Sequence, residues 1–302
     1  MPELPDVTVY QERIEALLGG RVLEAVRLTS PFLLRTVEPP LTAVHDRTLV
    51  HCHRLGKRLV LEFDGELFLV LHLMIAGRLR WHPPGKLVGG KIDLAGFDFA
   101  HGTLVLTEAG TKKRASLHVV QGRAALAQFD RGGLEVMQAT ALQFAAVLRR
   151  ENRTLKRALG DPTLFSGIGN AYSDEILHAA RLSPVTLTSR LGDAEIERLR
   201  VAVVQTLQAW TEQLRQEVGD GFPDKVTAFR EGMAVHGRFG KPCPVCSSPV
   251  QRIRYADNEC NYCATCQCGG RLLRDRGLSA LLKKDWPRTL AELEERRRPG
   301  ER

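Results

Sequence analysis

The sequence predicts a multidomain α+β protein. Three observations predict this fold class: a helical period in the first 18 residues, β-hairpin patterns between about 21 and 125, and helical patterns from about 135 to 217. Six of the seven cysteines then fall between residues 243 and 268, which adds a small cysteine-rich module. With 302 residues, 43% of them hydrophobic, the chain is long enough for two or three separate cores.

The composition excludes several classes of protein. Eleven Phe, three Trp and 26% charged residues argue against a disordered chain. The longest apolar stretch, residues 67–77, is interrupted by His72 and is too short to span a membrane. The acidic first segment lacks the apolar core of a signal peptide, so we expect a cytoplasmic protein. The net charge of +8 suits a nucleic-acid partner, although solvated basic surfaces explain it equally well.

The first segment carries five apolar side chains at spacings of three and four residues, namely Leu4, Val7, Tyr10, Ile14 and Leu17. This spacing predicts an amphipathic helix over residues 3–18. Pro2 would then lie at the start of this helix, directly before Glu3. If Met1 is removed, Pro2 becomes a terminal secondary amine, which is a nucleophile beside a carboxylate.

The β segment contains two clear hairpin patterns. The strand-like RLVLEF is followed by a turn at Asp64-Gly65 and then by ELFLVLHL, and FDFA precedes His101-Gly102 and TLVL. Several such ribbons indicate either a β-sandwich or a β-barrel.

The helical segment has its clearest period on one face, formed by Ile196, Leu199, Val203, Leu207, Trp210 and Leu214. Before it, DPTLFSGIGNAYSDEILHAARLSP at 161–184 predicts a tight connection from a short helix, about 152–159, to a second helix that begins near Asn170. Asn170 can cap that helix or direct its amide towards a phosphate. An ordinary glycine-containing connection, with Lys156 a solvated surface lysine, explains the same pattern.

The cysteines form two CxxC pairs, Cys243 with Cys246 and Cys263 with Cys266, separated by sixteen residues. This spacing favours one tetrahedral Zn²⁺ site, and the intervening segment can form two strands around a turn at 256–258. The metal would supply much of the folding free energy of such a small module.

Two questions about this module stay open at the level of the sequence. Cys260 could replace Cys266 in the ligand set, and Cys268 is a further candidate. A purely structural zinc explains the spacing best, but Arg252 and Arg254 near the turn keep a nucleic-acid contact open.

Three motifs in order, MPELPD, SGIGNAYSDEIL and YCATCQ, resemble the formamidopyrimidine-DNA glycosylase and endonuclease VIII family of base-excision repair enzymes. The resemblance extends over about residues 2–267 and is closer to the formamidopyrimidine branch, which Leu4 favours. It implies an N-terminal β-sandwich domain with its helix (1–125), a helix-two-turn-helix DNA-binding domain (126–232) and a zinc finger (233–270), followed by a helical, basic tail (271–302).

The resemblance also implies a mechanism and site residues. Pro2 would attack the deoxyribose C1′ of a damaged nucleotide, form an imine and break the backbone by β,δ-elimination, with Glu3 as proton shuttle. Lys57 matches a hairpin lysine that contacts the backbone near the lesion, and Lys156 and Asn170 match residues that hold flanking phosphates. We therefore expect a monomeric, bifunctional glycosylase and abasic-site lyase acting on oxidised bases in double-stranded DNA, with one structural zinc.

The sequence departs from the family pattern at several positions. Asp6 replaces the usual Glu, and Ile75 replaces a methionine that fills the gap left by a flipped base. At the finger tip Asn258 stands where an Arg is common, which removes a charge. The stretch TKKRAS, with Lys112, Lys113 and Arg114, replaces an Arg and a Phe that probe the opposite base; its cations can bind phosphates instead.

Two other functions remain open from the sequence. One is a lyase restricted to abasic sites or single strands, which the missing opposite-base probe would suit. The other is a non-catalytic binder of damaged DNA, against which the presence of both Pro2 and Glu3 argues. The leucine-bearing tail is expected to pack on the finger, with an extended DNA surface or a contact with another repair protein as alternatives.

Overall fold

The computed structural model describes residues 1–255, 258–275 and 285–297, which divide into two compact units. The first unit contains Met1–Gly133 and Gln208–Ala228. The second contains Leu134–Leu207 and the described residues from Phe229 onward. Residues 208–228 thus pack with the first unit although they continue a helix that begins in the second.

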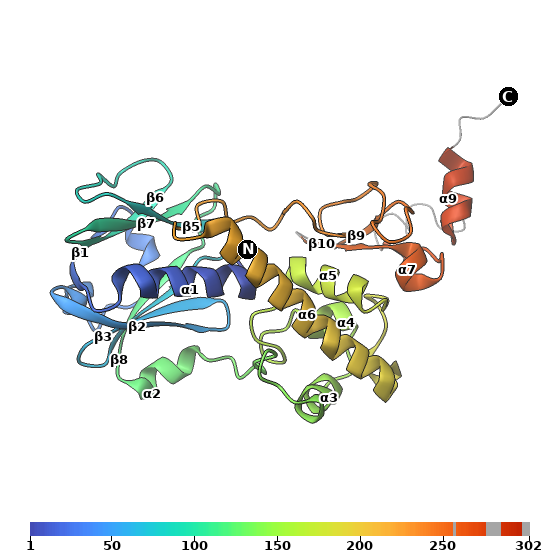
Figure 1. Ribbon diagram of the computed structural model, residues 1–302, viewed down its shortest axis with the longest axis horizontal. Helices are drawn as coiled ribbons and strands as arrows, with labels where there is room; N and C mark the ends of the chain where they lie inside the picture. Colours follow the sequence, from blue (N-terminus) through green and yellow to red (C-terminus); the bar gives the residue numbers. More distant parts are fainter. Residues whose placement is uncertain (256–257, 276–284, 298–302) are drawn as a thin grey trace. The chain divides into compact units, whose positions relative to one another are not determined.

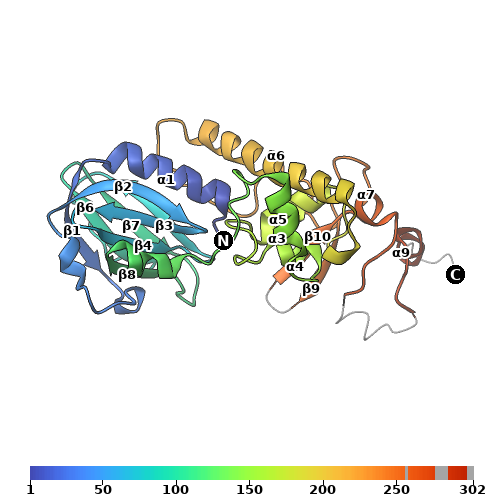
Figure 2. The ribbon, with the colours of Figure 1, turned by 90° about the horizontal axis from the view of Figure 1, so that it is seen from below.

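The first unit is built on an eight-stranded antiparallel sheet in the order β5-β7-β6-β1-β2-β3-β4-β8 (Figures 1 and 2). Its strands are β1 (Val22–Leu28), β2 (Arg47–Leu55), β3 (Arg58–Phe63), β4 (Leu67–His72), β5 (Gly77–His82), β6 (Asp93–Phe99), β7 (Gly102–Glu108) and β8 (Ser116–Gln121). Only two residue pairs, Val22 with Thr48 and Leu23 with Arg47, join β1 to β2. The sheet therefore consists of two halves of four strands each, and its distinct edges, β5 and β8, favour the sandwich over a closed barrel.

The core of the first unit collects apolar side chains from both halves of the sheet and from α1 (Leu4–Leu18). Val7, Tyr10 and Ile14 of α1 are fully buried in it. The Tyr10 hydroxyl also donates to the Leu79 carbonyl at 3.3 Å and accepts from the Leu79 N–H at 3.2 Å, which fixes the helix to β5. The predicted N-terminal helix is confirmed.

Both predicted hairpins are present. Phe63 pairs with Leu67 around the Asp64-Gly65 turn, where Gly65 has φ +74°, and Phe99 pairs with Gly102. The first turn forms because the chain needs a left-handed backbone at Gly65, which glycine adopts without steric cost.

The loop between β4 and β5 is held by a close backbone approach. The Gly77 N–H donates to the Leu73 carbonyl at 2.9 Å, and a Cβ added at Gly77 would lie 2.2 Å from that oxygen. Met74 has φ +52°, and the Ile75 side chain at the tip is 55% exposed. Only glycine fits position 77, and the turn it permits directs Ile75 towards solvent.

The second unit begins with short helices and connections. Its helices are α3 (Ala141–Arg149), α4 (Leu155–Leu159), α5 (Asn170–Ala179) and the first part of α6 (Asp193–Val218). All six apolar side chains of the predicted α6 face are buried. The remaining short elements are η1 (Pro31–Leu33), η2 (Leu41–Val44), α2 (Arg123–Leu126) and η3 (Ala127–Phe129) of the first unit and η4 (Thr188–Arg190) of the second.

The cysteine-rich module forms the expected hairpin. Strands β9 (Gln251–Tyr255) and β10 (Asn258–Tyr262) pair antiparallel, and α7 (Ala264–Cys268) follows. The predicted turn includes residues 256–257, which lie outside the described residues.

The described end of the tail packs on this module. Helix α9 (Leu290–Arg297) places Leu290 in a cluster with Tyr262, Leu272 and Leu273. Leu278, Leu281 and Leu282 of the predicted tail helix fall outside the described residues. In the part of the chain that the structure describes, no helix is both long enough and apolar enough to cross a membrane.

Replacing Gly77 with Ala should reduce the unfolding free energy by about 1–3 kcal/mol, because the new methyl group displaces the Leu73 carbonyl. Equilibrium urea unfolding measures this change. Gly89→Ala is the matched control, since no atom lies within 4 Å of its added Cβ, and it should change stability by less than about 0.5 kcal/mol. Equal stability of the two variants would contradict the role given to the close approach.

Candidate active site and metal centre

The chain start gathers two acids beside a buried imino acid. Pro2 is buried, and Glu3 and Asp6 are only 2% and 3% exposed. The Glu3 N–H donates to Asp6 Oδ2 at 2.9 Å, so Asp6 caps the first turn of α1 despite its shorter side chain. The capping contact fixes the backbone at Glu3 and therefore the direction in which residues 1–2 leave the helix.

The electrostatic surroundings of the chain start favour a neutral amine. Burial lowers the pKa of the Met1 amino group below its usual value; Glu3 and Asp6 oppose the change, whereas the charges of Arg78 and Lys57 strengthen it. Arg78 was not predicted as a site residue. Its guanidinium donates to the carbonyls of Gly77 (2.6 Å) and Ile75 (3.2 Å), which ties the Ile75 loop to the same region.

Lys57 lies in the two-residue turn between β2 and β3, after Gly56 with φ +61°. The side chain is half-buried at the tip of the β2–β3 hairpin, a hairpin position that the family resemblance implied. Burial, Arg58 and Lys57 together hold the pKa of His72 at about 4, so that imidazole is neutral near pH 7.

The TKKRAS stretch forms a loop anchored by one buried carboxylate. Glu108, 1% exposed, accepts from the backbone N–H groups of Arg114 (3.0 and 2.9 Å) and Ala115 (3.2 Å), and Lys113 donates to its carbonyl. The side chains of Lys112, Lys113 and Arg114 are exposed. This loop therefore presents three cations on a fixed backbone.

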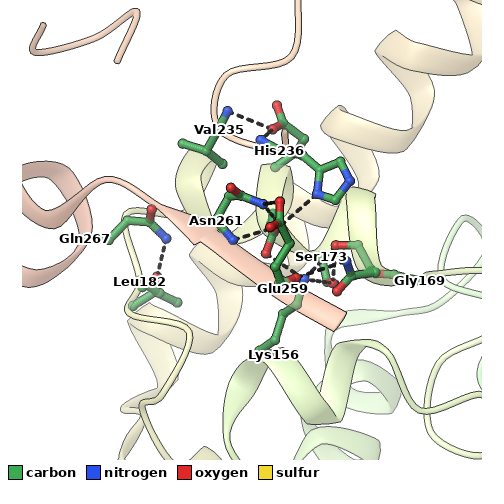
Figure 3. Close-up of polar contacts among 12 residues, drawn as sticks. Lys156, Gly169, Ser173, Leu182, Val235, His236, Glu259, Asn261 and Gln267 are labelled. Atoms are coloured by element: carbon green, nitrogen blue, oxygen red, sulfur yellow. Dashed lines mark hydrogen bonds and ion pairs between the residues drawn. The ribbon is translucent and has the colours of Figure 1, made fainter. Parts of the chain in front are cut away.

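Lys156 is buried, not solvated. Its side chain is 8% exposed, and the ammonium donates to Asn170 O (2.6 Å), Ser173 Oγ (2.9 Å) and Asp174 Oδ1 (2.6 Å), which employs all three N–H groups (Figure 3). Burial acts to lower its pKa, but the charge and hydrogen bond of Asp174, together with Cys260 and Tyr255, outweigh burial and raise it. The surface-lysine alternative is wrong because α4 packs this residue against α5.

Asp174 is the centre of this buried network. Its Oδ2 accepts from His236 Nδ1 (2.8 Å) and from the Asn261 backbone N–H (3.1 Å), the latter in β10. Burial would raise the pKa of Asp174, but Lys156 and His236 outweigh it, so the pKa lies below its usual value. Four segments of the second unit therefore meet at one carboxylate.

Glu175, the next residue, holds the segment before the finger. Its carboxylate accepts from three successive backbone N–H groups, those of Ala234 (2.7 Å), Val235 (2.9 Å) and His236 (2.8 Å). Sequence reasoning assigned no role to Asp174, Glu175, His236 or Asn261. The only signal was the DE pair inside the SGIGNAYSDEIL motif.

Asn170 is the first residue of α5, and its N-cap is Gly169, so the capping alternative for Asn170 is wrong. The Asn170 amide instead donates to the Glu259 carbonyl of β10 at 3.0 Å. Gly167 has φ +80°, which permits the tight approach that the motif predicted.

The four predicted zinc ligands come together. The Sγ atoms of Cys243, Cys246, Cys263 and Cys266 all lie within 4.8 Å of one another, a separation that suits a single tetrahedral ion with Zn–S bonds of about 2.3 Å. Cys260 is buried next to Asp174 and is outside this group, as is Cys268. The cluster fits a structural zinc finger.

At the finger tip, Asn258 and Arg254 are exposed. Asn258 pairs with Tyr255, and the Arg254 backbone N–H donates to Asp275 (2.6 Å). Arg252 is engaged elsewhere, with its guanidinium 4.2 Å from the Phe239 ring centroid and 3.6 Å from the Glu259 carboxylate.

Comparison with known families identifies the chain. The family described as "Formamidopyrimidine-DNA glycosylase N-terminal domain" matches residues 1–119, and the "Formamidopyrimidine-DNA glycosylase H2TH domain" matches residues 134–218. Together they cover more than half of the sequence. The chain belongs to the formamidopyrimidine-DNA glycosylase family.

Curated relatives agree with this membership. An uncharacterized formamidopyrimidine-DNA glycosylase-like protein of Mycobacterium tuberculosis is 38% identical over 151 residues, which span 50% of this chain and 94% of that protein. The formamidopyrimidine-DNA glycosylase of Exiguobacterium sibiricum is 28% identical over 277 residues, 88% of this chain and 99% of the relative. The family resemblance inferred from the three motifs is confirmed.

Solved structures show the same fold. The Lactococcus lactis formamidopyrimidine-DNA glycosylase, in complex with DNA containing Fapy-dG, matches with a TM-score of 0.77 at 24% identity, over 88% of this chain and 100% of that chain. The same enzyme bound to DNA containing an abasic site gives a TM-score of 0.75, at the same identity. The predicted fold class of N-terminal domain, helix-two-turn-helix domain and zinc finger is confirmed.

Replacing Lys156 with Met should lower the stability of α5 by about 3–5 kcal/mol, because it leaves the buried Asp174 carboxylate without its main counter-charge. Hydrogen exchange of α5 amides measures this free energy within the second unit. Arg149→Gln is the control: it removes an exposed ion pair with Asp193 and should cost less than about 1 kcal/mol. Wild-type protection of α5 in the Lys156 variant would show that the lysine is not structural.

Proposed function

We propose that this family DNA glycosylase is bifunctional: it excises oxidised bases and cleaves the resulting abasic site through an imine on Pro2. The observation that carries the proposal is the chain start. There, Pro2, whose nitrogen becomes a secondary amine once Met1 is removed, lies next to a buried carboxylate, in surroundings that lower the pKa of a terminal amine. A non-catalytic DNA binder has no use for this combination.

The proposed chemistry follows from the groups present. Met1 is removed, and the Pro2 nitrogen forms a bond to C1′ while the C1′–base bond breaks and the base leaves with a proton. Glu3 protonates the sugar ring oxygen, which opens the ring and leaves an iminium between Pro2 and C1′. Loss of a C2′ proton then expels the 3′ phosphate, a second elimination expels the 5′ phosphate, and water releases Pro2.

The cations have separate proposed roles. Lys57 contacts the backbone near the lesion, and Lys112, Lys113, Arg114 and Arg254 neutralise phosphates from exposed positions. Asn170 and Asn258 offer amides to flanking phosphates. We propose that Lys156 acts indirectly, because its three N–H groups are bound internally and one of them fixes the Asn170 carbonyl.

The other components of the proposal are the partner and the metal. The enzyme works as a monomer on damaged double-stranded DNA in the cytoplasm, in association with the nucleoid. One structural Zn²⁺ is held by Cys243, Cys246, Cys263 and Cys266, whose thiols form a complete four-sulfur donor set. The same proposal includes a contact between the tail and another repair protein. Pull-down experiments with the purified full-length and tail-deleted proteins test this contact.

Borohydride trapping tests the imine. Protein whose Met1 removal is verified by intact mass is incubated with duplexes carrying 8-oxoguanine, a formamidopyrimidine, an oxidised pyrimidine or an abasic site. We expect a covalent adduct that peptide mapping assigns to Pro2. Pro2→Gly should reduce trapping strongly, and Glu3→Gln should slow base excision by about 10²–10⁴-fold, the usual contribution of a general acid, with little change in binding.

The outcomes separate the competing functions. An adduct only with the abasic site indicates a lyase without base excision. Preferred cleavage of single-stranded DNA indicates a lyase that is restricted to single strands. Tight binding without any adduct indicates a damage binder. Normal excision in both variants would overturn the assignment of Pro2 and Glu3.

Ile75 provides a second test, because its exposed apolar side chain is proposed to fill the gap left by the flipped base. Ile75→Ala should slow excision from duplex DNA by about tenfold, equivalent to about 1.4 kcal/mol of transition-state stabilisation. Single-turnover rates on duplex and single-stranded substrates measure the effect, which should be confined to duplex. Leu87→Ala, at a residue 85% exposed in the same unit, is the control; an equal loss there would contradict the wedge.

A further inference from the structure

Helix α5 turns one polar face towards the cysteine-rich module. Asn170, Asp174 and His178 are spaced four residues apart, so they lie one above another on this helix. Asn170 donates to Glu259 O at 3.0 Å, and Asp174 accepts from the Asn261 N–H at 3.1 Å. These two hydrogen bonds therefore attach β10 of the hairpin to the helix. His178 is the next residue along the same row.

His178 reaches a cysteine of the metal cluster. Its Nε2 lies 3.2 Å from Cys243 Sγ, and both side chains are buried, with exposed fractions of 6% and 1%. A cysteine that binds zinc is a thiolate, which can accept but not donate a hydrogen bond. In the metal-bound protein the contact is therefore an N–H···S hydrogen bond donated by Nε2.

We propose that His178 is a positioning residue of the zinc centre: its hydrogen bond to Cys243 stabilises the bound metal and connects that metal to α5. The inference rests on the proposed zinc site and not on the glycosylase chemistry. Hydrogen bonds from residues around a metal site orient the ligands and tune their electron donation. Here the donor is supplied by the DNA-binding helix rather than by the finger.

The connection has a consequence for DNA binding. Asn170, a proposed phosphate contact, begins the same ten-residue helix that carries His178 near its end. Gln267 of α7 reinforces that end, because it donates to Leu182 O at 2.9 Å and accepts from the Cys263 N–H at 2.8 Å. Because α5 joins the two sites, zinc and DNA should each increase the affinity for the other.

The first experiment compares full-length wild type with His178→Phe, His178→Gln and His51→Phe. Phe keeps the ring volume but removes the N–H, Gln restores a donor, and His51 is a control histidine on the other unit, 68% exposed. Zinc affinity is measured by competition with a chelator. We expect a loss of about 10–100-fold for His178→Phe, partial recovery for His178→Gln and no change for His51→Phe.

Cobalt substitution separates the hydrogen bond from packing. With Co²⁺ in place of zinc, the sulfur-to-cobalt charge-transfer band reports electron donation by the thiolates. The band should shift in His178→Phe and return towards the wild-type position in His178→Gln. An unshifted band together with wild-type zinc affinity in His178→Phe would overturn the inference.

The link to α5 is tested by repeating the zinc competition with a duplex that contains an abasic-site analogue. DNA should raise the zinc affinity of wild type more than that of His178→Phe, and an equal rise in both would overturn the link. A wild-type protein that binds no zinc would overturn the zinc site and this inference together. If the protein binds zinc as expected but does not excise bases, the proposed glycosylase chemistry is wrong and the inference about His178 is unaffected.

Discussion

The second unit depends on the burial of one carboxylate. An ionised Asp174 without partners would cost several kcal/mol to desolvate, so the fold is stable only when Lys156, His236 and Asn261 converge on it. These partners come from α4, from the segment before the finger and from β10. Lys156 donates to Oδ1 and the other two partners donate to Oδ2, so the charge fixes the relative positions of the segments that carry them.

This arrangement changes the interpretation of Lys156. Considered alone in the sequence, Lys156 looks like a phosphate ligand or a surface residue. In the fold, its ammonium forms an ion pair with Asp174, and its remaining N–H groups donate to Asn170 O and Ser173 Oγ. The cation therefore stabilises the helix start from inside. The amide of Asn170 is held in turn by Glu259 O, so the N-terminus of α5 is fixed on both sides before any DNA arrives.

The sequence predicts most of the fold because short-range patterns specify it. Hairpin turns at Asp64-Gly65, the apolar face of α6 and the CxxC spacing each depend on residues that are close in the chain. The Asp174 network could not be predicted in this way, because its partners His236 and Asn261 are 62 and 87 residues away. No period or spacing encodes such a contact. Cys260 illustrates the same limit: its spacing fits a zinc ligand, but the fold buries it beside Asp174 instead.

Two departures from the family pattern, Ile75 and the stretch 112–114, fall on exposed side chains whose backbones are tightly held. Ile75 lies on a loop that Gly77 closes against Leu73, and Lys112, Lys113 and Arg114 lie on a loop that Glu108 anchors from a buried position. A rigid backbone lowers the entropy lost when a side chain engages DNA, so substitutions at these tips change what is contacted without changing the support. The chain start follows the same rule, because Asp6 fixes the backbone at Glu3 and therefore the direction in which residues 1–2 leave the helix. In the proposed mechanism, lesion choice can therefore diverge through the loop tips while the amine chemistry at the helix start is retained.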